Sequence, residues 1–185
     1  MQSWRIRKAI PYIGKDHVVL DIGSADGALF KRTDVAKRVA GGVGIDPDAQ
    51  SSVAGRFRMV RGSFPADLPV DQQFGSITVL AVLEHIPADQ QPVFARSCFE
   101  RTLPGGTLIL TVPGPMVDRI IDALTRIRVL DGMSVEQHHG FDPKGTIPLF
   151  EDAGFTLTLS RKFQLGLNHL YVFTKGSGTA AERKR

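Results

Sequence analysis

Short apolar runs that alternate with stretches of helical periodicity constrain the fold of this chain more than any other feature. Five runs stand out: His17–Ile22, Gly42–Asp46, Phe57–Gly62, Gly75–Val82 and Thr107–Val112. Each is apolar enough to be buried on both faces, which is typical of strands inside a parallel sheet. The pattern therefore predicts five parallel strands.

Helical stretches lie between these runs. One spans Ala28–Val39. Another opens at Pro87, a favoured first helical position, and continues to about Glu100 with Val93, Phe94 and Cys98 pointing inward. Strands that alternate with helices predict an α/β fold whose sheet is wound by right-handed crossovers.

The carboxyl-terminal third departs from this alternation. Pro115–Leu130 carries a helical stripe of apolar residues, and a polar stretch follows it. A last helix is expected between an Asp142 cap and Gly154. Phe155–Phe163 and His169–Thr174 alternate in part, and their short connection predicts an antiparallel pair. The sequence thus predicts a mostly parallel sheet of seven strands with an antiparallel hairpin.

Composition fits one globular domain. The chain has 185 residues, of which 42% are hydrophobic and 23% charged. We expect a single domain over residues 1–175 and a disordered polar tail over residues 176–185. The single cysteine, Cys98, lies in an apolar stretch and is expected to be packed.

Membranes and nucleic acids are not expected partners. No apolar run approaches the roughly 20 residues of a membrane span, and no secretory leader is recognised, so we expect a cytoplasmic protein. The net charge is +4, of which the last ten residues supply +2 through Arg183, Lys184 and Arg185 against Glu182. Charges of both signs are interspersed elsewhere, which does not fit a nucleic-acid face.

The turn after the first strand indicates a ligand site. It reads DIGSADG over Asp21–Gly27, and its glycines let the backbone pass close to a ligand while helix-start amides favour an anionic group. Asp46 ends the next strand, and an acidic side chain there can accept hydrogen bonds from the hydroxyls of a ribose. Together these features indicate a nucleoside-bearing cofactor with an anionic end.

The glycine pattern separates two kinds of cofactor. A dinucleotide needs G-x-G-x-x-G so that its pyrophosphate can settle on the helix start. Here glycines stand only at Gly23 and Gly27, so the turn suits a smaller carboxylate better than a diphosphate.

Four motifs in order carry a family resemblance. They are VVLDIGSADG, VGIDP, FGSITVLAVLEHIP and LPGGTLILTVP. In order and spacing they resemble the motifs of class I S-adenosylmethionine-dependent methyltransferases, of the small-molecule, type 11-like kind, over about Val18–Gly154. The resemblance implies a Rossmann-like three-layer sandwich and S-adenosylmethionine as cofactor.

The resemblance also implies roles for the first turn. Gly23, Ser24 and Gly27 would line the methionine portion of the cofactor. The carbonyls near Gly23 and Ala81 would receive its ammonium group, and Asp21 would order the loop. Ala25 departs from the family, which often has glycine there.

At the adenosine end, the resemblance implies that Asp46 holds the ribose and that Pro47 or Phe64 flanks the adenine. Ser63 stands where the family often has an acidic residue that contacts the adenine amine. Ser63, the backbone amide of Phe64 or the Asp67 side chain could take that role. A further departure is Gly75-Ser76, where an aspartate commonly opens the fourth strand.

Three histidines are candidate catalytic bases. His85 follows the fourth strand, and His138 and His139 precede the last helix. An imidazole suits proton transfer near neutral pH. Structural roles are the alternatives. In the family that this chain resembles, the histidine at the position of His85 often shapes the cofactor pocket, and His138 or His139 could order the turn before Asp142.

Alternatives remain open at this stage. A small-molecule acceptor is expected, and the sequence leaves a homodimer open. A non-catalytic S-adenosylmethionine-binding module and an NAD-dependent oxidoreductase are the rival functions, and the missing glycine disfavours the second. Trp4 and Tyr12 are expected to pack the first helix rather than to contact the acceptor.

Overall fold

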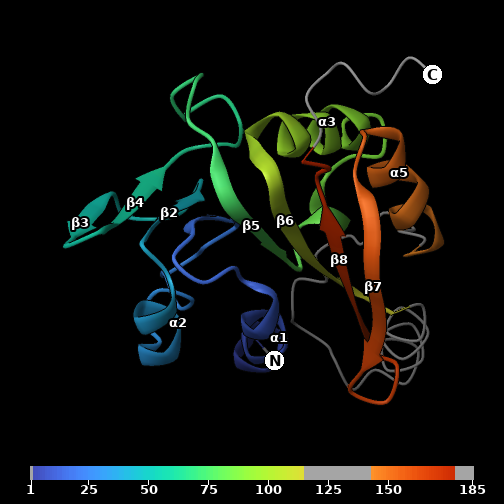
Figure 1. Cartoon of the computed structure of the whole chain (residues 1–185), viewed down its shortest axis with the longest axis horizontal. Coiled ribbons are helices and arrows are strands. Elements are labelled where there is room, and N and C mark those ends of the chain that lie inside the picture. The colour runs from blue at the N-terminus through green and yellow to red at the C-terminus, as the bar shows by residue number, and fades with distance from the viewer. Residues whose placement is uncertain (1, 115–142, 178–185) are drawn as a thin grey trace, which may run out of the picture.

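The computed structural model describes residues 2–114 and 143–177 (Figure 1). The helices and strands follow one another in this order: α1 (Gln2–Ala9), the 3-10 helix η1 (Ile10–Tyr12), β1 (Val18–Ile22), α2 (Thr33–Arg38), β2 (Gly41–Asp46), β3 (Ser52–Ala54), β4 (Phe57–Arg61), β5 (Phe74–Leu80), η2 (Leu83–His85), α3 (Gln91–Arg101), β6 (Thr102–Pro113), η3 (Pro143–Gly145), α5 (Thr146–Asp152), β7 (Thr156–Phe163) and β8 (Asn168–Thr174).

One mixed sheet organises the described residues, with strand order β3-β4-β2-β1-β5-β6-β8-β7 (Figure 1). The strands β4, β2, β1, β5 and β6 run parallel, whereas β7 and β8 pair antiparallel, as the sequence predicted. The α/β, Rossmann-like fold class is confirmed. The sheet has an eighth strand beyond the seven expected, because Ser52–Ala54 pairs antiparallel with the edge strand β4.

The sheet positions a ligand site where its strand order reverses. From β1 the chain proceeds outward through β2 to β4, and from β5 it proceeds in the opposite direction to β6. In open α/β sheets, ligands bind beyond the carboxyl ends of the strands at such a switch point. The site therefore falls at the carboxyl ends of β1, β2 and β5.

Apolar side chains cover both faces of the sheet. In β1, Leu20 belongs to the core cluster that includes Phe94 of α3, whereas Val19 belongs to the cluster that includes Ile6 of α1 and Val35 of α2. Alternate residues of a strand point to opposite faces, so a strand covered on both sides must be apolar at nearly every position. This is why the continuous apolar runs identified the strands correctly.

The helices begin later than the sequence suggested. The stretch after β1 makes turns as far as Lys31, and α2 covers only Thr33–Arg38 of the predicted Ala28–Val39. Pro87 opens a turn, in which the Gln91 amide donates to its carbonyl at 3.2 Å, and α3 begins at Gln91. In both cases turns occupy the residues expected to form the first part of the helix.

Val93 was wrongly predicted to be buried. Its side chain is 66% exposed, because the inward face of α3 runs through Phe94, Ala95 and Cys98. Cys98 is fully buried as predicted, and its burial raises the pKa of the thiol. A buried thiol held in its neutral form is a packing group rather than a nucleophile.

Expectations for the first and last helices can also be compared with the structure. Trp4 is 52% exposed, whereas Tyr12 packs partly buried against the cluster around α1. Asp142 lies outside the described residues, and α5 is preceded by η3 and followed by Gly154 at φ 108°. No helix in the described ranges is both long and apolar enough to cross a bilayer.

Ser76 holds the amino-terminal segment onto the sheet. Its hydroxyl is completely buried, accepts a hydrogen bond from the Gly14 amide at 3.0 Å, and lies 2.9 Å from His17 Nδ1 and 3.0 Å from Thr107 Oγ1. This serine stands in the segment where an aspartate would have matched the family pattern. In this structure the serine hydroxyl has three polar partners.

We expect Ser76→Ala to lower the free energy of unfolding by about 2 to 3 kcal/mol, because it leaves buried polar groups without a partner. Urea denaturation followed by circular dichroism measures this. Ser160→Ala, at an exposed position in β7, is the control and should change the value by less than about 0.5 kcal/mol. Equal effects of the two substitutions would contradict the role of Ser76.

Candidate functional site

The loop after β1 is held by backbone hydrogen bonds to β2. The amides of Gly23 and Ser24 both donate to the Ile45 carbonyl, at 2.9 and 3.3 Å, and the Gly27 amide donates to the Ser24 carbonyl at 2.8 Å. Gly23 and Gly27 have φ values of 73° and 75°, which glycine adopts readily. The two glycines thus stand where the turn requires them.

Ala25 occupies the left-handed region without the freedom of glycine. Its φ is 45°, and its amide donates a hydrogen bond of 2.9 Å to Asp46 Oδ2. The other carboxylate oxygen, Asp46 Oδ1, accepts from the Asp48 amide at 2.8 Å. Asp46 therefore ties the loop after β1 to the loop after β2. Each oxygen retains a further lone pair for a ligand hydroxyl.

Asp21 lies in β1, two residues before Gly23, and its carboxyl group contacts the neighbouring strand β5. It is buried and accepts a hydrogen bond of 2.7 Å from Thr78 Oγ1 of β5. Burial raises the pKa of Asp21 to about 7, although the hydrogen bond from Thr78 favours the charged form. Asp21 thus exchanges its proton near neutral pH.

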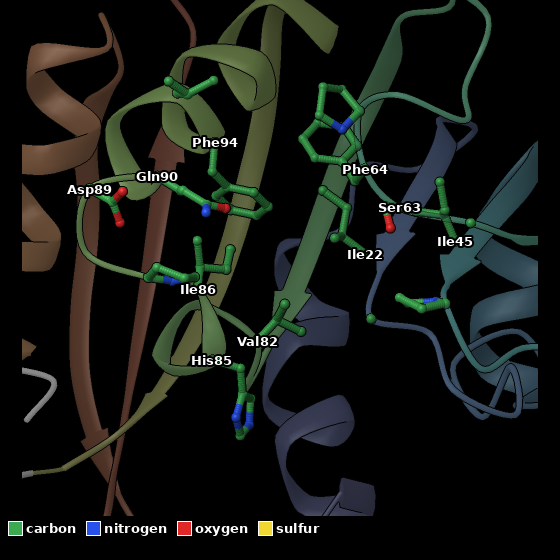
Figure 2. A pocket seen from close by; sticks show the side chains of 16 residues that line it. Ile22, Ile45, Ser63, Phe64, Val82, His85, Ile86, Asp89, Gln90 and Phe94 are labelled. Carbon is green, nitrogen blue, oxygen red and sulfur yellow. The ribbon is translucent and has the colours of Figure 1, made fainter. Parts of the chain in front are cut away.

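A cavity of 420 Å³ opens at the carboxyl ends of β1 and β2 (Figure 2). It brings together five residues that the sequence singled out: Gly23, Pro47, Ser63, Phe64 and His85. Its volume lies within the range of small-molecule sites. Four predicted cofactor residues and one candidate base therefore share one concave surface at the switch point. The other predicted cofactor residues do not line it: Asp21, Ser24, Gly27, Asp46 and Ala81.

The cavity wall is apolar and aromatic at one end. Phe64 and Phe94 meet edge to face with ring centroids 5.5 Å apart, and Figure 2 shows His85 at the other end. Asp89 and Gln90 add polar groups to the lining. This arrangement suits a flat, apolar ring with a few polar atoms on its edge.

Three predicted residues lie behind this wall or beside it. Ser24 is buried, and its Oγ has no hydrogen-bond partner in the described structure. A Cβ at Gly27 would meet Met59 Sδ at 3.2 Å, so Gly27 lets the loop pass close to β4. Ala81 follows β5 at φ 63°, a conformation that costs energy for a residue with a Cβ.

The groups expected to contact the adenine amine differ in whether they line the cavity. The Asp67 carboxylate already accepts a hydrogen bond of 2.8 Å from the Ser63 amide, and Asp67 is not part of the cavity lining. Ser63 and Phe64 do line it. The histidine pair His138 and His139 lies outside the described residues.

A second hollow of 660 Å³ lies on the other side of the loop, where Asp46 and Asp48 line it together with Ala25. Asp26 on its rim pairs with Lys31 at 2.9 Å, both exposed. Because Asp46 lines this hollow while its chain neighbours line the first, its carboxylate sits between the two. Among the residues described, no cluster of three His, Cys, Asp or Glu side chains could hold a metal ion.

Sequence reasoning missed part of the cavity. Val82, Ile86 and Gln90 line it, and Phe94 was assigned only to the core. The segment from the end of β5 to the first turn of α3 places them there. A signal existed in the Glu-His-Ile-Pro segment after the fourth strand, where a proline marks an early departure from the sheet.

Comparison with known proteins identifies relatives of the fold. A family model described as "Methyltransferase domain" matches residues 3–160. No curated protein matches the chain in a sequence search.

Solved structures with the same fold are distant in sequence. A chain of the Haloferax volcanii complex between the Trm112 methyltransferase activator and a methyltransferase aligns with TM-score 0.71 and 15% identity, covering 94% of this chain and 90% of its own. The N-methyltransferase NodS of Bradyrhizobium japonicum, bound to S-adenosylhomocysteine, aligns with TM-score 0.65 and 15% identity, covering 94% and 85%. The cyclopropane synthase MmaA2 of Mycobacterium tuberculosis aligns with TM-score 0.66 and 17% identity, covering 94% and 83%.

We expect Gly23→Ala to disrupt the site. A Cβ there would collide with Val82 Cγ2, and φ is 73°. Gly105→Ala is a matched control, because Gly105 has φ 75° but open space around its Cβ position. The control should cost about 1 to 2 kcal/mol of stability from φ alone, and Gly23→Ala should cost more. Denaturation measures both, and equal losses would show that contact with Val82 is unimportant.

Asp21 should make stability fall as pH rises. Its folded pKa of about 7 lies above the ordinary 3.8, so the folded state holds the proton more tightly between these values. The unaltered protein should lose about 2 to 3 kcal/mol between pH 5 and pH 8, and Asp21→Asn should largely remove this loss. Denaturation at both pH values tests it. Asp152→Asn, at an exposed site on α5, should leave the loss in place; a loss that survives in Asp21→Asn contradicts the assignment.

Proposed function

We propose that this chain, which belongs to the family of methyltransferase domains, transfers a methyl group from S-adenosylmethionine to a small-molecule acceptor. The observation that carries the proposal is the position of Asp46. Its carboxylate joins the glycine loop after β1 to the end of β2 and stands beside the cavity at the switch point. We propose a single domain over residues 1–175.

The adenosine portion fits the cavity. The adenine ring would lie against the apolar wall formed by Ile22, Phe64 and Phe94, and Pro47 would flank it. The ribose hydroxyls would donate to the free lone pairs of Asp46. The Ser63 hydroxyl would accept from the adenine amine and the Phe64 amide would donate to a ring nitrogen of adenine, since Asp67 does not line the cavity.

The methionine portion would lie over the loop after β1. A Cβ at Gly23 would fill space against Val82, so glycine keeps this approach open. The carbonyls near Gly23 and Ala81 would accept hydrogen bonds from the ammonium group. Ser24 would line this portion through its backbone, because its buried hydroxyl lies against Gly44 of β2. Asp21 would hold the loop in place from below.

For methyl transfer, the protein mainly has to align the acceptor with the cofactor. The sulfonium methyl is electrophilic and leaves a neutral thioether when bound cofactor reacts. The protein must bring the acceptor into line with the sulfur–methyl bond and keep water away. His85 lines the cofactor cavity, so we assign it to shaping that cavity first and to proton transfer second. His138 and His139 remain candidate bases on the acceptor side.

The acceptor class rests on two kinds of support. The aligned structures include an N-methyltransferase and a cyclopropane synthase, so one fold serves different acceptors. Charges of both signs interspersed along the chain do not fit nucleic acid. A screen of small acceptors that measures S-adenosylhomocysteine release tests catalysis. Cofactor binding without release in any reaction would favour the non-catalytic module.

We expect Asp46→Ala to weaken binding of S-adenosylmethionine at least tenfold in calorimetry, because hydrogen bonds to a charged group contribute about 1.5 to 3 kcal/mol. Asp48→Ala removes the same charge from the same loop but keeps the amide that donates to Asp46, and it should change the affinity less than threefold. An unchanged affinity in Asp46→Ala would refute the ribose assignment.

A further inference from the structure

Three groups form a hydrogen-bonded chain at the beginning of β8. His169 Nδ1 lies 3.0 Å from the hydroxyl of Tyr171, and that hydroxyl donates to the Pro143 carbonyl at 3.4 Å. The two rings stand at 89° to each other with centroids 5.9 Å apart. None of these residues lines the cofactor cavity described above.

The hydrogen bonds of Tyr171 favour one tautomer of His169. A phenol has a single hydrogen, and the Pro143 carbonyl, which can only accept, lies 3.4 Å from the Tyr171 oxygen. When Tyr171 donates that hydrogen to Pro143, its oxygen is left to accept from Nδ1–H of His169 at 3.0 Å. In a neutral imidazole with hydrogen on Nδ1, the other nitrogen, Nε2, carries an unprotonated lone pair.

That lone pair is buried and unused. In the part of the chain that the structure describes, Nε2 of His169 has no hydrogen-bond partner. Leaving a buried acceptor unpaired costs about 1 to 3 kcal/mol. Burial and the nearby charge of Lys162 lower the pKa of His169, so the ring is neutral at pH 7. An oriented, neutral imidazole with a free nitrogen is suited to accepting a proton.

The strand register places His169 level with Ala81, the residue proposed above to contact the methionine end of the cofactor. Leu80 pairs with Thr111 in the parallel ladder, so Ala81 stands level with Val112, and Val112 pairs with His169. Ala81 and His169 are thus two strand spacings apart, roughly 10 Å. Tyr171 and Val112 share the core cluster that includes Val79 and Phe94, so His169 belongs to the same face of the sheet as the cofactor cavity. An acceptor that contacts both Nε2 and the bound cofactor would have to span this separation.

We propose that His169 is the general base for a hydroxyl acceptor, an inference that rests on the proposed function. The acceptor O–H donates to Nε2 while an oxygen lone pair attacks the sulfonium methyl. The new bond is O–CH₃, and the C–S bond breaks with its electron pair remaining on sulfur. The acceptor proton passes to Nε2 and then to solvent, so the products are the methyl ether, S-adenosylhomocysteine and one proton.

A hydroxyl fits this nitrogen better than an ammonium ion does. An O–H that donates to Nε2 still offers lone pairs toward the methyl group, whereas an ammonium ion has none. The hydroxyl also becomes more acidic as the methyl group is transferred, which makes a base useful at that moment. His85 differs, because it borders the cofactor cavity and not this position.

The first test compares His169→Gln with the unaltered protein on matched acceptor pairs, phenol with aniline and cyclohexanol with cyclohexylamine. We expect hydroxyl methylation to fall at least 100-fold in His169→Gln, while calorimetry shows S-adenosylhomocysteine affinity within twofold. Tyr171→Phe should lose about tenfold, since the packing remains but Nδ1 loses its partner. Arg161→Gln, an exposed site in β7, is the control and should keep full activity.

The second test reads the tautomer directly. In protein labelled with ¹⁵N-histidine, the His169 ring at pH 7 should carry its proton on Nδ1, and Tyr171→Phe should shift the balance toward Nε2–H. A ring protonated on Nε2 in the unaltered protein overturns the proposal. So does methylation confined to the amines, methylation of neither hydroxyl, or full activity in His169→Gln. If S-adenosylhomocysteine does not bind the unaltered protein at all, the proposed function fails instead.

Discussion

The hydrogen bonds to the Asp46 carboxylate are the interaction on which the rest of the site depends. One oxygen accepts from the Ala25 amide and the other from the Asp48 amide, so one side chain fixes two loops that are far apart in the sequence. The loop after β1 then takes positive φ at Ala25 and Gly27. Without the hydrogen bond from the Ala25 amide to Asp46, fewer interactions would stabilise the strained backbone conformation of Ala25.

The Asp46 carboxylate also lies between two parts of the site that differ in chemistry. On one side lies the apolar cavity with Phe64 and Phe94, and on the other lies the polar hollow with Asp26 and Lys31. Asp21 adds a carboxyl below the loop, where burial moves its pKa to about 7. The sheet thus presents apolar side chains and two carboxyl groups, those of Asp21 and Asp46, at the ends of β1 and β2.

The central strands β1, β2, β5 and β6 were predictable from sequence because each buries both faces, and a continuous apolar run such as that around Leu20 admits few other structures. The strand β4 was expected to be buried in the same way, but it lies nearer the edge of the sheet and is only half-buried. The helix starts were not, because local turns precede both helices, as where the Lys31 amide donates to the Gly27 carbonyl and the Gln91 amide to the Pro87 carbonyl. Such turns continue the apolar spacing of the helix that follows. In the site, Gly23 and Asp46 could be found from local spacing. The hydrogen bonds around His169 could not be found in this way. They depend on Tyr171 and on the Pro143 carbonyl, which lies 28 residues before Tyr171 in the chain.

The strand order also governs how the sheet is completed during synthesis. β8 is the last of the described strands to leave the ribosome, yet it lies between β6 and β7 and pairs with both. Until it emerges, β6 presents an unpaired edge, and β7 has no neighbour in the sheet. Unpaired edges invite association between chains. A nascent chain of this protein is therefore most exposed to aggregation just before its final hairpin forms.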